Sequence, residues 1–256
     1  MIDRRKDIYG SILSSCPSWA SIRSQTDFEI RLIAQIKRVS GKITRSYDLL
    51  INILHDGKVA VQEVSTNALL PLWCPQRHIN ANGTFCIGLR ADSSVNDAAS
   101  AENWWRALEV FLSCQETAFE SRKWPPTLQL SHGDAADIQL RAEALAQKLN
   151  REKDYEAAVA YNEGPIAGLS RHVSRITGRL TNPQAPCMCG YTRGSQIKHR
   201  KDCARDNNLC LVVLKNRRRK AELSFWRALT GKLTCCGTID DCPIRKEISN
   251  NGHTSG

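Results

Sequence analysis

The sequence lacks any long run of apolar residues. No stretch approaches the roughly 20 consecutive apolar residues of a membrane span, although 41% of the 256 residues are hydrophobic. Residues 1–6 carry charge with no apolar run behind them, which argues against a secretory signal. We see no internal repeat of useful period. These absences exclude membrane proteins and repeat arrays, and we expect a cytoplasmic protein.

A cytoplasmic location also excludes a disulfide framework, because disulfides are rare in reducing compartments. The chain nevertheless has 11 cysteines. Seven of them crowd between Cys187 and Cys242, and the others are scattered singly, as Cys16, Cys74, Cys86 and Cys114. Crowded cysteines in a reducing compartment indicate metal ligands.

Acidic residues are fewer than basic ones, 26 against 36, and the net charge is +10. Much of the excess is local, because the segment from Arg193 to Lys220 holds ten Lys or Arg and two Asp. The run from Lys215 to Lys220 has three possible interpretations. It binds nucleic-acid phosphates, it binds an acidic face of a partner protein, or it is a solvated helix face.

The first third of the chain has the patterning of a β-meander. Apolar residues alternate with mostly polar ones over 28–36 and 47–53, which predicts half-buried strands. Asp56 and Gly57 then lead into a β-rich run at 58–64, and Asp-Gly between two such runs predicts a hairpin. We expect a short helix over 8–22 before these three strands.

Residues 66–100 show no sustained periodicity and predict a long ordered loop, a feature that is usually functional. Ser100 is the expected N-cap of the following helix. One face of that helix is apolar and carries Trp104, Leu108, Phe111, Cys114 and Ala118. We expect Trp104 and Trp105 in the core, one or two helices over 134–162, and a basic helix over 211–229.

The long loop contains the most informative segment, Arg77 to Leu89. It shows His78-Ile79-Asn80, then Asn82-Gly83, then Cys86-Ile87. These motifs, after a meander and before a Trp-bearing helix, resemble those of ubiquitin-conjugating enzymes over roughly residues 8–125. Proline is replaced by Ile79, the spacing from Asn to Cys is two residues shorter, and the expected tryptophan comes only at Trp104 or Trp105. In these departures the chain is similar to divergent bacterial conjugating enzymes from ubiquitin-like operons, many linked to phage defence.

The resemblance implies a thioester carrier whose catalytic residues are Cys86, Asn80 and His78. Thiolate is both nucleophile and leaving group in such a reaction. By position, Asn80 would donate a hydrogen bond to the oxyanion, and His78 would shape the loop more than it moves protons. Asp92 or Asp97 is a candidate to orient or deprotonate an attacking amine.

A papain-like peptidase is an alternative that also uses Cys with His. The available histidines are His132 and His172. Such peptidases place the nucleophile at the start of a helix, which lowers the thiol pKa. Cys86 lies in a segment without a helix start, so this alternative is the weaker one.

The cysteine-rich tail predicts a structural zinc site. Cys187, Cys189, His199 and Cys203 supply the four ligands of a tetrahedral site, and their pattern resembles the SEC-C motif. A second possible set is Cys210, Cys235, Cys236 and Cys242. Zinc would replace the hydrophobic core that so polar a segment lacks.

The sequence therefore predicts an α+β fold: a ubiquitin-conjugating-enzyme-like domain over 1–130, made of an antiparallel β-meander with flanking helices. A helical extension over 131–165, a linker over 166–186 and a zinc-binding tail over 187–256 would follow. The expected function is conjugation of a ubiquitin-like protein, and the expected partners are that protein, its activating enzyme and a protein acceptor. A nucleic-acid-binding zinc protein with an inactive conjugating-enzyme-like domain is the second hypothesis.

Overall fold

The computed structural model consists of two compact units. The first is formed by Met1–Pro125 together with Thr234–Gly256, and the second by Pro126–Leu233. The residues that it describes are 4–174, apart from positions 39, 65, 67 and 94, then 192–193, 196–197 and 210–245. No helix among these residues is long and apolar enough to cross a bilayer.

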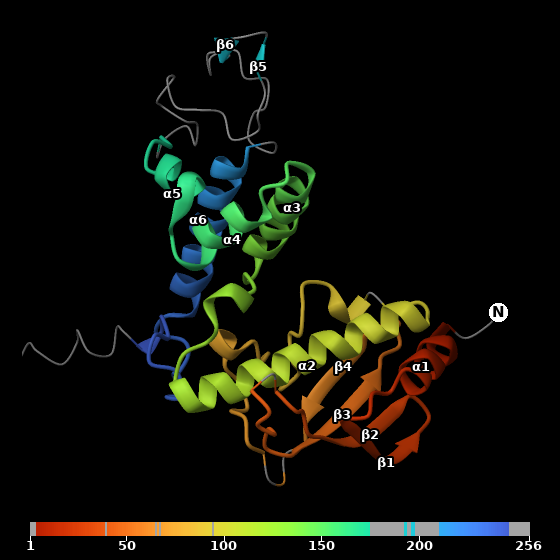
Figure 1. Ribbon diagram of the computed structural model, residues 1–256. Coiled ribbons are helices and arrows are strands. Elements are labelled where there is room, and N and C mark those ends of the chain that lie inside the picture. The colour runs from red at the N-terminus through yellow and green to blue at the C-terminus, as the bar shows by residue number, and fades with distance from the viewer. Residues whose placement is uncertain are drawn as a thin grey trace, which may run out of the picture. The chain divides into compact units, whose positions relative to one another are not determined.

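The first unit is built on a four-stranded antiparallel sheet. The strands follow the chain in the order β1 (Ala20–Thr26), β2 (Glu29–Ala34), β3 (Tyr47–Ile53) and β4 (Val59–Glu63). In Figure 1 they lie side by side, with α1 (Arg4–Ser14) and α2 (Ala98–Ser121) packed on them. This is the expected α+β meander.

The two strands predicted from alternation are confirmed. Strand β3 buries every second residue, Tyr47, Leu49, Ile51 and Ile53, and β2 buries Ile30, Leu32 and Ala34. Side chains alternate between the two faces of a sheet, so one face collects the apolar residues.

The predicted hairpin is also present between β3 and β4. Gly57 has φ +79°, which favours glycine, and its N–H donates to the carbonyl of Leu54. The Asp56 carboxylate accepts the N–H of Lys58 at 3.1 Å.

The helix expected over 8–22 is wrong in its second half. Helix α1 ends at Ser14, and residues 20–26 form β1, a fourth strand at the sheet edge. Pro17 disfavours continuation of the helix. The sequence pattern did not predict this strand, because six of its seven side chains are exposed and burial does not alternate along it.

Helix α2 carries the apolar face that was expected, with Trp104 and Trp105 both in the core. Its N-cap, however, is Asp97 rather than Ser100. The Asp97 carboxylate accepts the N–H of Ser100 at 2.8 Å, and the Ser100 hydroxyl accepts the N–H of Asp97 at 2.9 Å. The pair forms a capping box in which Ser100 is the third helical residue.

The second unit is helical. It contains α3 (Asp134–Lys148), α4 (Glu152–Ala160), α5 (Gly164–Ser170) and α6 (Leu211–Leu229), with a two-stranded ribbon, β5 (Thr192–Arg193) and β6 (Gln196–Ile197). The helices share a core made of Ala142, Ala146, Tyr155, Ala158, Ile166, Ala167, Leu211, Val212 and Leu214.

Helices α3, α4 and α5 refine the prediction, and α6 confirms it. Residues 134–162 form two helices rather than one, and Asn150, which has φ +51°, lies at the break. Helix α5 occupies the start of the segment expected to be a linker, and it buries Ile166 and Ala167. Helix α6 has the bounds that the sequence predicts.

The segment after α6 returns to the first unit. The Arg122 guanidinium donates to the carbonyl of Gly237 and to the carboxylate of Asp240, both at 2.8 Å. The backbone pairs as well, because the N–H of Asp240 donates to the carbonyl of Arg122 at 2.9 Å. Ile239 and Ile244 are buried. Residues 234–245 are therefore packed onto the sheet domain and are not a free tail.

Candidate functional site

The segment that carries Cys86 folds back on itself as a small antiparallel ladder. The N–H of Cys86 donates to the carbonyl of His78 at 2.8 Å, and the N–H of Asn80 donates to the carbonyl of Thr84 at 2.8 Å. Between them, Ile79 and Phe85 form a β-bridge. The ladder therefore fixes the backbone on both sides of the thiol.

Two further contacts attach this ladder to the sheet domain. The N–H of Phe85 donates to the carbonyl of Val61 on β4 at 2.8 Å. The Phe85 ring stacks on Phe111 of α2, with centroids 4.7 Å apart. Ile79 is also buried, so the Ile79 and Phe85 side chains form the inward face of the ladder.

The turn of the ladder is made by Asn82 and Gly83. Gly83 has φ +81°, and its N–H donates to the carbonyl of Asn80 at 2.9 Å. The Asn82 amide oxygen accepts the N–H and the hydroxyl of Thr84. This pair is therefore a turn that holds the loop in shape.

Asn80, Thr84 and Cys86 share the outward face of the ladder, since side chains alternate along paired strands. Asn80 is exposed and Cys86 is half-buried. Diagonal neighbours of this kind have Cα atoms roughly 7–8 Å apart. The Asn80 amide nitrogen donates to the Thr84 hydroxyl at 3.0 Å, which restrains that amide beside Thr84.

The electrostatics around Cys86 favour the protonated thiol. Burial raises the pKa of Cys86, and the nearby Asp92 carboxylate raises it further, whereas the N–H of Gly88 lowers it. The thiol is thus not preactivated as a thiolate, and it suits a reaction whose incoming carbonyl is already activated, such as thioester exchange.

His78 is buried and has the left-handed backbone conformation, with φ +55°. Its N–H donates to the carbonyl of Pro75 at 2.8 Å, and its ring packs edge-on against Trp124, with centroids 5.0 Å apart. Together with the bond from Cys86, these contacts hold His78 within the loop, and the loop-shaping role that the resemblance implies stays a prediction.

The two candidate carboxylates differ in their surroundings. Asp92 lies close enough to the thiol to influence its pKa. Asp97 is the N-cap of α2, and its hydrogen bonds with Ser100 lower the pKa of its carboxyl. Asp92 is therefore the better placed of the two beside Cys86.

The peptidase alternative finds no support. Cys86 lies on a β-ladder and not at the start of a helix. His132, in the second unit, is paired with the carboxylate of Glu222 at 2.6 Å and stacks on Phe225. These contacts join the start of α3 to α6, which gives His132 a structural role.

The two predicted sets of zinc ligands differ in what the structure shows of them. Cys187, Cys189, His199 and Cys203 lie outside the described residues, so this zinc site stays a prediction. Of the second set, Cys210 packs against the core of the second unit. Cys235, Cys236 and Cys242 belong to the first unit, where the thiol that meets them is Cys74, whose sulfur lies 3.1 Å from that of Cys236.

Sequence reasoning missed Cys74, which reads alone as a small buried hydrophobe. Its position directly before the candidate loop was the available signal. In the described part of the chain, no three His, Cys, Asp or Glu side chains are arranged, as they stand, to hold a metal ion.

The basic run on α6 is not a single exposed surface. Lys215 and Arg218 are buried, and they donate to the side chains of Asn162 and Ser131 inside the second unit. Arg217, Arg219 and Lys220 are exposed. Two of the five cations therefore hold α6 in place and are removed from any phosphate-binding surface.

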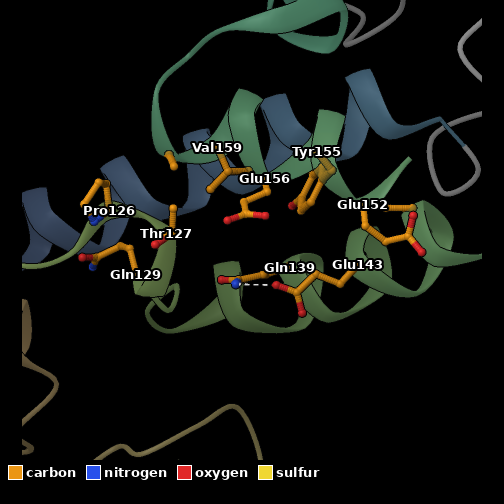
Figure 2. Close-up of a pocket in the computed structure, with 11 residues that line it drawn as sticks. Pro126, Thr127, Gln129, Gln139, Glu143, Glu152, Tyr155, Glu156 and Val159 are labelled. Carbon is orange, nitrogen blue, oxygen red and sulfur yellow. Dashed lines mark hydrogen bonds between the residues drawn. The ribbon is translucent and has the colours of Figure 1, made fainter. Parts of the chain in front are cut away.

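The second unit also has an acidic pocket between α3 and α4. Glu143, Glu152 and Glu156 line it, and Gln139 donates to the Glu143 carboxylate at 2.7 Å (Figure 2). Tyr155 lies beside them, and its buried hydroxyl has no hydrogen-bond partner among the described residues.

Two family models match the chain. Residues 19–126 match the prokaryotic E2 domain, and residues 131–244 match the cysteine-rich domain that lies C-terminal to the E2 domain. No curated protein and no solved structure matches. The chain is therefore similar to a prokaryotic E2 domain in the region that contains the Cys86 ladder, and to a cysteine-rich domain in the region that follows.

Proposed function

We propose that this protein is a conjugating transferase that carries a ubiquitin-like protein as a thioester on Cys86 and passes it to a lysine or another acceptor. The observation that carries the proposal is a partly buried thiol on a hydrogen-bonded ladder, within the region that matches the prokaryotic E2 domain. An activating enzyme would supply the thioester, in a cytoplasmic bacterial pathway of the phage-defence type.

Two acyl transfers make up the reaction. First, the Cys86 thiolate attacks the thioester carbonyl held by the activating enzyme, whose own thiolate leaves. Then an acceptor amine attacks the new thioester, Cys86 leaves as a thiolate, and the amine gives up a proton as the amide forms. Asp92, whose carboxylate influences the pKa of Cys86, would take that proton or orient the amine.

Asn80 would stabilise the oxyanion of the second step. An amide nitrogen has two N–H donors, and the bond to the Thr84 hydroxyl uses one of them. The second is left for the oxyanion on the Cys86 face. Loss of one such donor typically lowers the rate by about 10²–10³.

The test combines the protein with a cognate ubiquitin-like protein, its activating enzyme and ATP. We expect a covalent adduct that a thiol reductant removes. Cys86→Ala should abolish it, and Cys86→Ser should give an ester that resists the reductant, because an alkoxide is the poorer leaving group. Cys16→Ser is the matched control and should load normally. Loading that survives in Cys86→Ala would refute the proposal.

A second pair of variants tests the role of Asn80. Asn80→Ala should load normally but transfer to lysine about 10²–10³ more slowly. Thr84→Val removes the same hydrogen bond within the loop while it keeps the Asn80 amide. If Thr84→Val slows transfer as much as Asn80→Ala does, Asn80 serves the shape of the loop and not the oxyanion.

A further inference from the structure

Four cysteines gather in the first unit from two distant parts of the sequence. The Sγ atoms of Cys74 and Cys236 lie 3.1 Å apart, and both thiols are free. Cys235 interacts with the thiol of Cys242, which in turn lies within electrostatic reach of Cys74. Cys74 and Cys242 are only 2% and 3% exposed. The four sulfurs thus form two adjoining pairs.

Hydrogen-bonding groups lie beside two of the sulfurs. The N–H of Gly237 donates to the sulfur of Cys235 at 3.4 Å, and the Thr238 hydroxyl lies 3.0 Å from the sulfur of Cys236. Hydrogen bonds donated to sulfur favour a thiolate over a thiol. These contacts suit metal-binding thiolates better than small buried hydrophobes.

Arg77 gives an independent reason to expect negative charge here. Its side chain is 2% exposed, and its hydrogen bonds go to uncharged acceptors, the Gln115 side chain, the Gln115 carbonyl and the Thr238 hydroxyl. A buried cation needs a compensating charge. The guanidinium lies within electrostatic reach of Cys74 and Cys236, so thiolates at these positions would supply it.

We propose that one structural Zn²⁺ binds to the four thiolates of Cys74, Cys235, Cys236 and Cys242. The four thiols lose their protons on binding, and no redox step is involved. Four soft sulfur ligands around one centre are the donor set of structural zinc. The bound site carries net negative charge beside Arg77.

The observed sulfur separation is compatible with this geometry. Zn–S bonds of about 2.3 Å in a tetrahedron set the sulfurs about 3.8 Å apart, so the Cys74–Cys236 pair would open slightly as the two pairs close around the metal. A disulfide would instead need about 2.05 Å. Two further thiols and a buried guanidinium lie near the pair. A bound metal explains the presence of these groups, whereas a disulfide between Cys74 and Cys236 does not.

The ligand set would join the cysteine-rich extension to the Cys86 loop. Cys74 pairs through its backbone with Ile79, at 3.0 and 3.2 Å, and Ile79 bridges to Phe85. The metal would therefore anchor residues 234–245 at the base of the ladder that presents Cys86. This conclusion needs only the four cysteines and does not depend on the proposed function.

Metal analysis of the full chain, purified under reducing conditions without added zinc, tests the proposal. Cys74→Ser and Cys236→Ser should each contain one equivalent of zinc fewer than the wild type, whatever the other cysteines bind. Cys16→Ser, the matched control, should keep the wild-type content. Zinc content unchanged in Cys74→Ser, or iron in place of zinc, would overturn the assignment.

A measurement on the wild type guards against a variant that fails to fold. In differential alkylation with mass spectrometry, the four thiols should be protected until a chelator removes the metal, and should then react together. A Cys74–Cys236 disulfide in the untreated protein, or alkylation of Cys74 independent of the chelator, would overturn the proposal.

Discussion

Among the described residues, two tyrosines are buried, Tyr47 and Tyr155, and their hydroxyls test the hydrogen bonding of the two units. The hydroxyl of Tyr47 on β3 donates to the carboxylate of Glu116 on α2, which also accepts from Arg45. Glu116 is 4% exposed. Burial and the carboxylate both raise the pKa of Tyr47, so the hydroxyl stays protonated and donates. In contrast, the buried hydroxyl of Tyr155 on α4 has no partner among the described residues.

The same substitution should therefore have opposite effects at the two positions. Tyr47→Phe removes a hydrogen bond to a charged acceptor and should lower the free energy of unfolding of the first unit by about 1.5–3 kcal/mol. Tyr155→Phe removes a buried group that makes no hydrogen bond, and it should leave the second unit unchanged or stabilise it by about 1 kcal/mol. Both variants keep the aromatic ring, so packing is matched.

Urea denaturation separates the two units. Five of the six tryptophans lie in residues 1–125, so their fluorescence reports mainly on the first unit. Far-UV circular dichroism reports on the helices of both units, so a transition that it shows and the fluorescence does not belongs to α3 to α6 of the second unit. A cost below about 0.5 kcal/mol for Tyr47→Phe, or an equal cost for the two variants, would refute the assigned hydrogen bonding.

Three further predictions concern the E2-like domain. Asp92→Asn removes a negative charge beside Cys86 and should therefore lower the pKa of that thiol. Single-turnover loading at pH 7 should then accelerate by about threefold for each unit of pKa lowered, because weaker nucleophilicity partly offsets the gain in thiolate. A slower loading rate would contradict this prediction. The rate of loading by the wild type should rise with pH through the neutral range, because the pKa of the Cys86 thiol is raised above the ordinary value for cysteine. A pH-independent rate would exclude a protonated Cys86. Asp97→Ala should cost about 0.5–2 kcal/mol of unfolding free energy through loss of the α2 N-cap, whereas Asp97→Asn should cost less, both measured by the same fluorescence assay; equal costs would argue against the capping role.

Local periodicity was enough to predict the elements that bury one face. Strands β2 and β3 alternate in burial as their residues alternate in polarity, and α6 begins and ends where the pattern does. The loop that carries Cys86 was predicted from a motif together with the absence of periodicity. These features depend on neighbours in the sequence, which a single chain displays directly.

Elements without such a signal were missed. Strand β1 is exposed along nearly its whole length, so its residues show no alternation, and only pairing with β2 makes it a strand. The same holds for Lys215 and Arg218, whose side chains read as a charged surface until the packing of α6 buries them. Polarity along the chain does not report a partner that lies elsewhere in the fold.

The thiols show the difference most clearly. From the sequence, Cys86 was singled out because its own neighbours form a motif. The grouping of Cys235, Cys236 and Cys242 followed from crowding, but the crowding also drew in Cys210, which packs in the other unit. Cys74 lies 162 positions from Cys236, and only the return of residues 234–245 to the sheet domain brings the two sulfurs together. Spacing predicts which cysteines can share a turn, whereas the tertiary structure decides which distant thiol lies beside them.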